Sequence, residues 1–449
     1  MYALFYLILL VAVVAIEFGR DKLAKVDSFS LFNLIFVMSY LMPAFLWALI
    51  PNVFADNMSY GLHYNAASTK EVAFIIYFSY ISFALFYFGM KKIRFPYLLS
   101  FKGWGDMSDS YFSNWKLVVV ILFFPLVVLL NITLVGDVSE YMAASTEARH
   151  VKTQFGIAGY FNYLLSGTLF AVIASLFLLG NKQGWTFKLL IFISFFLLAI
   201  GLLARGGRAG IVGVLIYSMV FLYYQGSLRP NIMGLIILSF TAFCSLFAIY
   251  FLRKIGANIV SGESLLHGIE INSFFNSVGA VLLYPFQYFA HYLFVIVEFF
   301  KDPDLYGFPR LGVDIISGAV LMLPGLNGVD VGLPVLPDII SQSVMKAYNG
   351  YIPPGWIGWA LMDGGLLFLV FKIFYSALIC LFFDKSYRYI GLTEFGRLVY
   401  FLLIMFVVDF IFKGTSTNLF RGNLGQILFI LMLLFIPFMR IGRMYLVRC

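Results

Sequence analysis

Apolar runs of roughly 20 residues, the length that crosses a bilayer core as a helix, recur along the chain and constrain it most. Of its 449 residues, 62% are hydrophobic and only 12% are charged, a composition that no water-soluble fold could bury. A membrane β-barrel would instead show alternating segments of about ten residues, which the sequence lacks. The chain is therefore predicted to be an all-α polytopic membrane protein.

The apolar runs predict about eleven transmembrane helices, the first of which begins after Met1 and reads as a retained helix, not a cleaved signal. We expect them at residues 2–19, 31–54, 71–90, 117–136, 160–180, 188–204, 209–224, 232–252, 356–382, 398–412 and 425–439. Residues 1–252 then hold the first eight helices, and residues 356–449 hold the last three. Residues 253–355 between them form one large outer loop that contains short amphipathic helices.

Charge placement orients these helices. With the N-terminus outside, the short cytoplasmic segments carry 17 Lys and Arg residues and the short outer segments carry 7. Basic residues favour the cytoplasmic side of short loops. The net charge of +8 is therefore mostly a matter of topology and does not indicate a nucleic-acid partner.

One apolar stretch, at residues 278–300, is long enough to span. It carries Pro285, Gln287, His291 and Glu298, and one extra crossing would invert every later helix. We therefore expect it to lie in or dip into the outer leaflet, with spanning as the alternative.

The sequence predicts neither a metal site nor a cofactor. Its three Cys residues are scattered, and no HExxH, Walker A, CxxC or dinucleotide-binding glycine pattern is present.

Arginines on the outer side are the most informative residues. Arg205 and Arg208 flank two glycines in a short turn, and a helix that begins near Ala209 would add its N-terminal amides there. Arg253, Arg310 and Arg421 lie in other outer segments. Guanidinium groups are suited to phosphate or carboxylate, so together they predict a cationic patch for a lipid-linked pyrophosphate. The alternative is that each side chain extends to lipid headgroups or water.

A general base would come from the same outer layer. The candidates are Glu263, His267, Glu270, His291, Glu298, Asp314, Asp330, Asp338 and Asp363. Asp314 would share a helix face with Arg310 if that stretch were helical. For His267 the competing interpretation is a polar residue on an amphipathic outer helix.

Other residues near the last helices carry separate expectations. Lys372 and Asp409 lie inside predicted spans, where charge is costly. Lys372 is expected to extend inward, and two such residues are few for an ion relay. Trp356 and Trp359 are expected to be interfacial anchors.

Four segments resemble the bacterial oligosaccharide repeat-unit polymerases, the Wzy-type O-antigen polymerases that include the enterobacterial common antigen polymerase. They are GGRAGIVGVLIYSMVFLYYQG, FLRKIGAN, YGFPRLGVDIISGAVLMLPG and PPGWIGWALMDGG. The resemblance covers residues 188–370 and, weakly, the rest. Arg208 matches the family's glycine-rich arginine only approximately, because Arg205 precedes the same glycines here.

The resemblance implies a GT-C-like glycosyltransferase of the bacterial inner membrane that works without metal at the periplasmic face. It would join undecaprenyl-pyrophosphate-linked glycans, with a Wzz-type chain-length regulator and a Wzx-type flippase as partners. Arg208, Arg310, Asp314 and His267 would be catalytic residues. Arg205, Arg208, Arg253, Arg310 and Arg421 would bind pyrophosphate; Arg310 and Arg253 match family positions, whereas Arg421 rests on position alone.

Two other functions remain open. An O-antigen ligase would use the same donor with a lipid A core acceptor, and its loop histidine would be His267 or His291. A flippase or transporter would need polar residues along several helices, which are scarce in this sequence.

Overall fold

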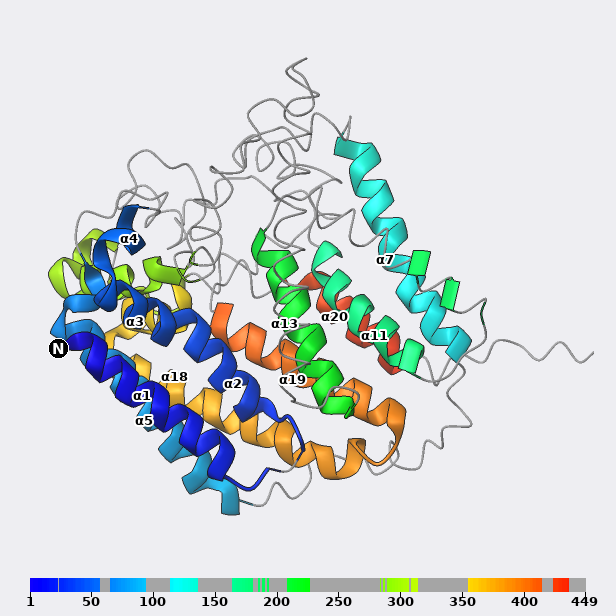
Figure 1. Ribbon diagram of the computed structural model, residues 1–449, viewed down its shortest axis with the longest axis horizontal. Helices are drawn as coiled ribbons and strands as arrows, with labels where there is room; N and C mark the ends of the chain where they lie inside the picture. The colour runs from blue at the N-terminus through cyan, green and yellow to red at the C-terminus, as the bar shows by residue number, and fades with distance from the viewer. Residues whose placement is uncertain are drawn as a thin grey trace, which may run out of the picture.

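The computed structural model describes residues 1–22, 24–56, 65–93, 114–135, 164–180, 208–226, 289–306, 308–313, 354–413 and 423–435, with a few isolated positions between them. This part of the chain is all-helical (Figure 1). Its main helices are α1 (Tyr2–Gly19), α2 (Ser28–Phe36), α3 (Met42–Leu49), α4 (Pro51–Asp56), α5 (Lys70–Gly89), α7 (Asn114–Val135), α11 (Thr168–Gly180), α13 (Arg208–Gln225), α18 (Gly355–Ile390), α19 (Glu394–Lys413) and α20 (Leu424–Phe435).

Nine of the predicted spans coincide with these helices, so the prediction from apolar runs is confirmed in position. The largest differences in described boundaries are in the second and ninth spans. The span predicted at 31–54 starts at Ser28, continues through a π-helical turn at Val37–Leu41 and ends at Leu49, before the separate α4. The span predicted at 356–382 continues to Ile390. The spans predicted at 188–204 and 232–252 lie almost entirely outside the described residues.

Four helical stretches in the described part are long and apolar enough to cross a membrane: Tyr2–Gly19, Ser28–Leu49, Lys70–Lys92 and Gly355–Ile390. Their length and composition identify the chain as a multi-pass membrane protein.

Helices that follow one another in the chain, from α1 to α5 and from α18 to α19, alternate in direction, which brings their ends together at two sides of the bundle. At the side where α1 starts, the Tyr2 end, Tyr6 Oη donates to Ala67 O over 2.9 Å, just before α5. At the other side, the Gly19 end, Ser28 Oγ donates to Cys380 O near the end of α18. The charge placement predicts that the Tyr2 end faces outward.

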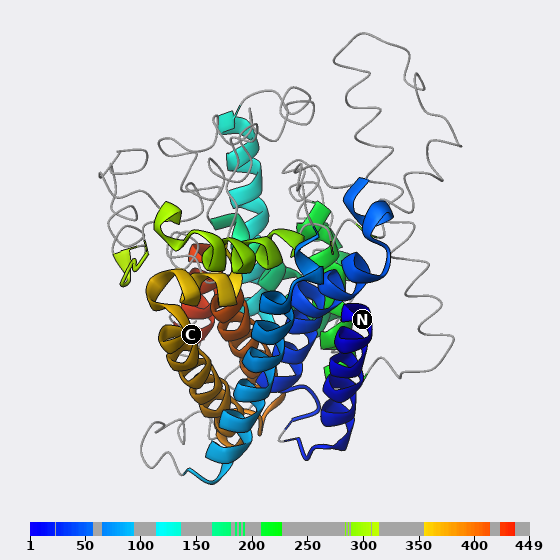
Figure 2. The ribbon, with the colours of Figure 1, turned by 90° about the vertical axis from the view of Figure 1, so that its left-hand side faces the viewer.

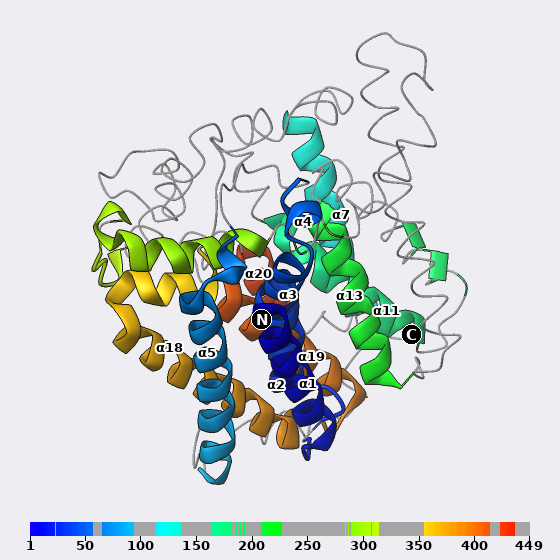
Figure 3. The same ribbon diagram turned by 60° about the vertical axis from the view of Figure 1, so that its left-hand side comes forward.

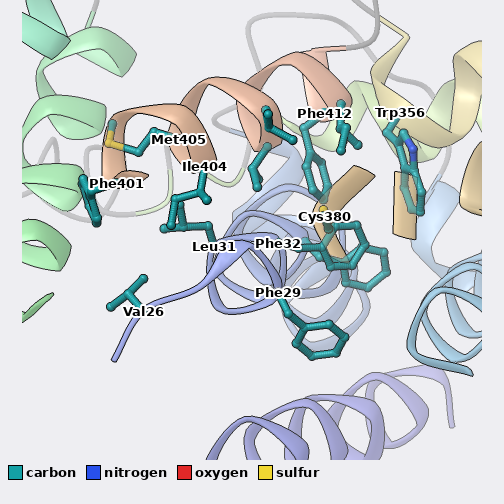
Figure 4. Packing of buried hydrophobic residues seen from close by; sticks show 14 of the residues in the cluster. Val26, Phe29, Leu31, Phe32, Trp356, Cys380, Phe401, Ile404, Met405 and Phe412 are labelled. Carbon is teal, nitrogen blue, oxygen red and sulfur yellow. The ribbon is translucent and has the colours of Figure 1, made fainter. Parts of the chain in front are cut away.

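Aromatic rings from α2, α5, α18 and α19 form the centre of the core. Phe32 stacks on Phe83 with ring centroids 3.5 Å apart, and Trp356 lies edge-on to Phe32. Phe412 of α19 packs against both Phe32 and Trp356 (Figure 4). Aromatic pairs of this kind add to the free energy gained by burying their area.

Residues 289–301 form a helix that runs across the bundle instead of along it, at the Tyr2 end (Figures 2 and 3). Its side chains from Ala290 to Val297 are all buried. An amphipathic helix at a membrane surface would expose one face, so the expectation of amphipathic character is wrong for this segment. Protein covers it: Val295 contacts α18 at Gly358, where an added Cβ would lie 2.7 Å from Val295 Cγ1. Its crosswise direction is the geometry expected of a segment that does not span.

Helix α18 is broken near its start. Gly364 (φ −166°, ψ 28°) and Gly365 (φ 69°, ψ −153°) leave helical geometry and divide it into a short arm, Gly355–Asp363, and a long arm that runs to Ile390. The φ and ψ of Gly365 fall in a region that is essentially restricted to glycine. The arm begins at Gly355, one residue before the predicted start of this span, and the Ile357 N–H donates to Tyr40 Oη of the π-helical turn over 3.0 Å.

Candidate functional site

The structure describes only part of the predicted site. Arg310 is described in full, and its side chain is 6% exposed. Helix α13 begins at Arg208, which confirms the predicted helix start near Ala209; only the main chain of Arg208 is described. Arg205, Arg253, His267, Asp314 and Arg421 lie outside the described residues, so the predicted arginine patch stays a prediction.

The segment that contains Arg310 docks on the break in α18. The Arg310 N–H donates to Met362 O over 3.2 Å, and the Leu311 N–H donates to Asp363 O over 3.0 Å. The last carbonyls of a helix have no partner within the helix, and these two are satisfied by the docked segment. Two of the segments that carry the family resemblance, YGFPRLGVD and PPGWIGWALMDGG, therefore meet at this point.

Asp363, the last residue of the short arm, fixes the junction from the other side. Its carboxylate is 2% exposed and accepts hydrogen bonds from Trp359 Nε1 over 2.6 Å and from the Gly312 N–H over 3.3 Å. The carboxylate thus ties its own helical turn to the docked segment. Asp363 was one of nine candidate bases, and this geometry gives it a positioning role.

Lys372 points toward this junction. Its Nζ lies 5.4 Å from the centre of the Trp359 ring, on the short arm, and it is attracted electrostatically by Asp363. The expectation that Lys372 extends inward is therefore wrong: its side chain extends toward the Tyr2 end. A cation over the face of an indole ring is stabilised by the ring's quadrupole.

Trp356 and Trp359 are both buried, so the prediction of two interfacial anchors is wrong. The Trp356 Nε1 donates to Ser376 Oγ over 3.2 Å inside the bundle. Both rings hold the short arm against the rest of the protein instead of marking a membrane surface.

Aromatic side chains surround the break. Phe308 and Phe299 lie edge to face, with ring centroids 5.4 Å apart, and both approach Gly365. Beside them Lys301 Nζ forms an ion pair with Glu298 over 3.4 Å, so this carboxylate is already neutralised. The main chain of Arg310, the Asp363 carboxylate and the Lys372 ammonium thus meet the break in a partly apolar setting.

A second polar cluster lies at the Gly19 end and was not predicted. Asp384 is fully buried and accepts hydrogen bonds from the Ser28 N–H (2.7 Å), Tyr87 Oη (2.6 Å) and Tyr400 Oη (3.0 Å), and its Oδ2 lies 2.7 Å from Ser28 Oγ. These donors come from α2, α5 and α19. Asp384 therefore ties four helices together; a lone Asp after an apolar run gives no sign of such partners.

A network of charges sits beside Asp384. Arg20 donates to both oxygens of Asp27 over 2.6 and 2.5 Å and also binds Glu17, which pairs with Lys22 over 2.6 Å. Burial alone would lower the pKa of Arg20, but the hydrogen bond and charge of Asp27 raise it above its ordinary value. The charged side chains at this end of the bundle are therefore paired with one another.

The third polar cluster lies between α19 and α20. Gln426 Nε2 donates to Asp409 Oδ2 over 3.2 Å, which gives the predicted intramembrane charge a partner. Asn423, just before α20, is fully buried, and neither atom of its amide has a hydrogen-bond partner among the described residues. Neither amide was predicted from the sequence.

The described residues hold no group of three or more His, Cys, Asp or Glu side chains that could bind a metal ion. Comparison of the chain with protein-family models, with curated proteins and with solved structures finds no match. The junction of Arg310, Asp363 and Lys372 is therefore interpreted from its own geometry.

Proposed function

We propose that this protein is a membrane glycosyltransferase that polymerises undecaprenyl-pyrophosphate-linked oligosaccharide repeat units at the periplasmic face of the bacterial inner membrane. The observation that carries the proposal is the docking of the Arg310 segment on the break of α18. Two segments that were singled out by resemblance alone are joined there by hydrogen bonds between Arg310 and Met362 and between Leu311 and Asp363.

The position of the junction supports the proposal. It lies at the Tyr2 end of the bundle, which the distribution of Lys and Arg predicts to face outward. A reaction between two lipid-linked glycans has to take place where both carriers can present their pyrophosphates, at the level of the headgroups. A docked segment at the Tyr2 end of the broken helix α18 suits that requirement.

The chemistry supports it as well. When a glycan leaves its carrier, negative charge develops on the departing pyrophosphate, and preorganised cations stabilise such charge in a low-dielectric site. Arg310 has a guanidinium that can bind two phosphate oxygens at once. Its main chain is fixed at Met362, so little reorganisation is needed when the charge develops.

An O-antigen ligase is the alternative, because it would use the same donor at the same face. His291 is the described histidine of the large loop, and it is 3% exposed with its ring 4.5 Å from that of Tyr292. Arg310 is buried to a similar extent, and His267 lies outside the described residues, so burial does not separate the two functions. The products that remain after gene deletion do separate them.

The test is deletion of the gene in its host, followed by electrophoresis of lipopolysaccharide. Loss of a polymerase leaves the core with a single repeat unit. Loss of a ligase leaves no repeat on the core, with polymer still on its carrier. An unchanged ladder would contradict both functions.

Complementation then tests the site. A plasmid that encodes Arg310→Ala should fail to restore the ladder although the protein is made at the wild-type level. Arg397→Ala is the matched control, because that arginine is 49% exposed and pairs with Glu394 at the Gly19 end. A full ladder from Arg310→Ala would refute the role given to Arg310.

A further inference from the structure

Lys372 is a cation within the long arm of α18, seven residues beyond Gly365 and thus about 10 Å along the helix from the break. A lysine at membrane depth is costly unless its charge meets a partner or reaches the interface. Its position therefore calls for a specific reason.

Within the described part of the protein, the Lys372 ammonium lacks hydrogen-bond acceptors. Its Nζ lies over the Trp359 ring, and within the described part of the chain it has neither a hydrogen bond nor an ion pair. Asp363 attracts it, but the carboxylate oxygens of Asp363 already accept from Trp359 and Gly312. An ammonium has three N–H donors, and an anion supplied from elsewhere would complete its coordination.

The helix surface beside Lys372 is apolar and points away from the other helices of the bundle. Leu367 is 82% exposed, Phe371 is 61% exposed and Tyr375 is 43% exposed. On a helix, Phe371 and Tyr375 share a face, and Lys372 lies at the edge of that face, between it and Trp359. In a membrane protein, such a face is covered by lipid chains.

We propose that Lys372 binds the phosphate of a membrane lipid that approaches sideways from the bilayer. Trp359 lines one side of this site, and the lipid chain packs on the face that contains Leu367 and Phe371. Lysine is a point charge well suited to phosphate. A soluble anion would have to cross apolar surface to reach the ammonium, whereas a lipid carries its phosphate there on its own tail. The bound phosphate would lie just below the junction that holds Arg310.

This inference goes beyond the proposed function, because it requires only a lipid phosphate and no glycan. It also explains why the short arm is fixed so firmly. Asp363 holds the Trp359 indole by a hydrogen bond of 2.6 Å, and the indole in turn lies under the ammonium. The phosphate site and the docked segment thus share one support.

The experiment is native mass spectrometry of the purified, detergent-solubilised protein with three probes: undecaprenyl phosphate, phosphatidylglycerol and inorganic pyrophosphate. Wild-type protein should retain the lipids, and Lys372→Met should retain them about 10- to 100-fold less, the effect of losing a hydrogen bond to a charged group. Lys372→Arg should keep the binding. Inorganic pyrophosphate should neither bind through Lys372 nor displace the lipids.

The matched control is Lys385→Met, on the same helix at the Gly19 end, where the Lys385 ammonium donates to Ile93 O. It should retain lipid like the wild type. Failure to fold is not expected to obscure the result, because methionine replaces a charge at membrane depth by an apolar chain of similar length.

Equal lipid retention by Lys372→Met and the wild type would overturn the proposal, as would an equal loss in Lys385→Met or equally tight, Lys372-dependent binding of pyrophosphate. The assay contains no glycan and measures no transfer. Its failure would leave the polymerase proposal standing, and an unchanged lipopolysaccharide ladder after gene deletion would leave the lipid site standing.

Discussion

The main-chain N–H of Arg310 donates to the carbonyl oxygen of Met362 over 3.2 Å. The contact joins the large loop to the last turn of the short arm of α18 through main-chain atoms. A substitution at position 310 therefore keeps the main-chain donor of this hydrogen bond.

Arg310→Lys should recover part of the polymerisation that Arg310→Ala loses. Lysine keeps the positive charge but loses the planar fork that binds two oxygens, so we expect shorter chains, not none. The measurement is the ladder length on a lipopolysaccharide gel at matched protein levels. Identical ladders from the Lys and Ala variants would show that charge at this position does not matter.

Asp363→Asn should weaken the docking of the segment at 310–313. The amide can still accept from Trp359 through its oxygen, but its NH₂ group cannot accept from the Gly312 N–H. We expect a loss of about 1–3 kcal/mol at the junction. Limited proteolysis should cut the large loop of the variant faster than that of the wild type. Asp304→Asn, on an exposed residue of the same loop, is the control and should be cut at the wild-type rate.

Gly365→Ala should disturb the break in α18. A residue with a Cβ at φ 69° and ψ −153° costs about 1–3 kcal/mol. We expect a lower thermal midpoint in detergent and loss of the polymer ladder, because the junction depends on the break. Gly19→Ala is the matched control, since a Cβ added there meets nothing within 4 Å. Equal thermal midpoints in the two variants would contradict the strained geometry.

Gly425→Ala should separate α20 from the start of α11. A Cβ at this position would lie 2.5 Å from Gly167 N and closer still to Leu164 O, and main-chain atoms cannot move aside. Overpacking of this kind costs about 1–3 kcal/mol. Thermal unfolding in detergent measures the loss. Gly89→Ala, where nothing lies within 4 Å of the added Cβ, should unfold like the wild type.

Asp384→Ala should destabilise the bundle strongly. The change leaves the Ser28 N–H and the Tyr87 and Tyr400 hydroxyls buried and without their acceptor, at about 1–3 kcal/mol each. We expect little folded protein after extraction in detergent, as judged by gel filtration. Glu394→Ala removes an exposed carboxylate near the same end and should leave the elution profile unchanged.

The helices of the described region were predictable because membrane insertion requires long apolar runs, and such runs can be read directly from the sequence. The start of α18 at Gly355 was predictable for the same kind of reason, since two prolines and a glycine are local signals. The break at Gly364 and Gly365 was not predicted. Both glycines lie within an apolar run, and only the docked segment shows why the helix stops there.

The site was predictable only as a set of residue types. Arg310 stood out because a basic residue on the outer side opposes the usual charge bias. Its contact with Met362 joins positions 52 residues apart, and no periodicity encodes such a pair. The directions of the Lys372 and Trp359 side chains depend on the break, so they could not be predicted before it was known.

The hydrogen bonds to Asp384 also determine when the growing protein can complete this part of its fold. Tyr87 precedes Asp384 by 297 residues, and Ser28 precedes it by 356. At a synthesis rate of about 5–20 residues per second, the acceptor of Tyr87 is made roughly 15 to 60 seconds after Tyr87 itself. The first helices therefore enter the bilayer with polar groups that only the late helix α18 can satisfy, and a nascent chain that stalls before residue 384 exposes those groups to any quality-control protease in the membrane.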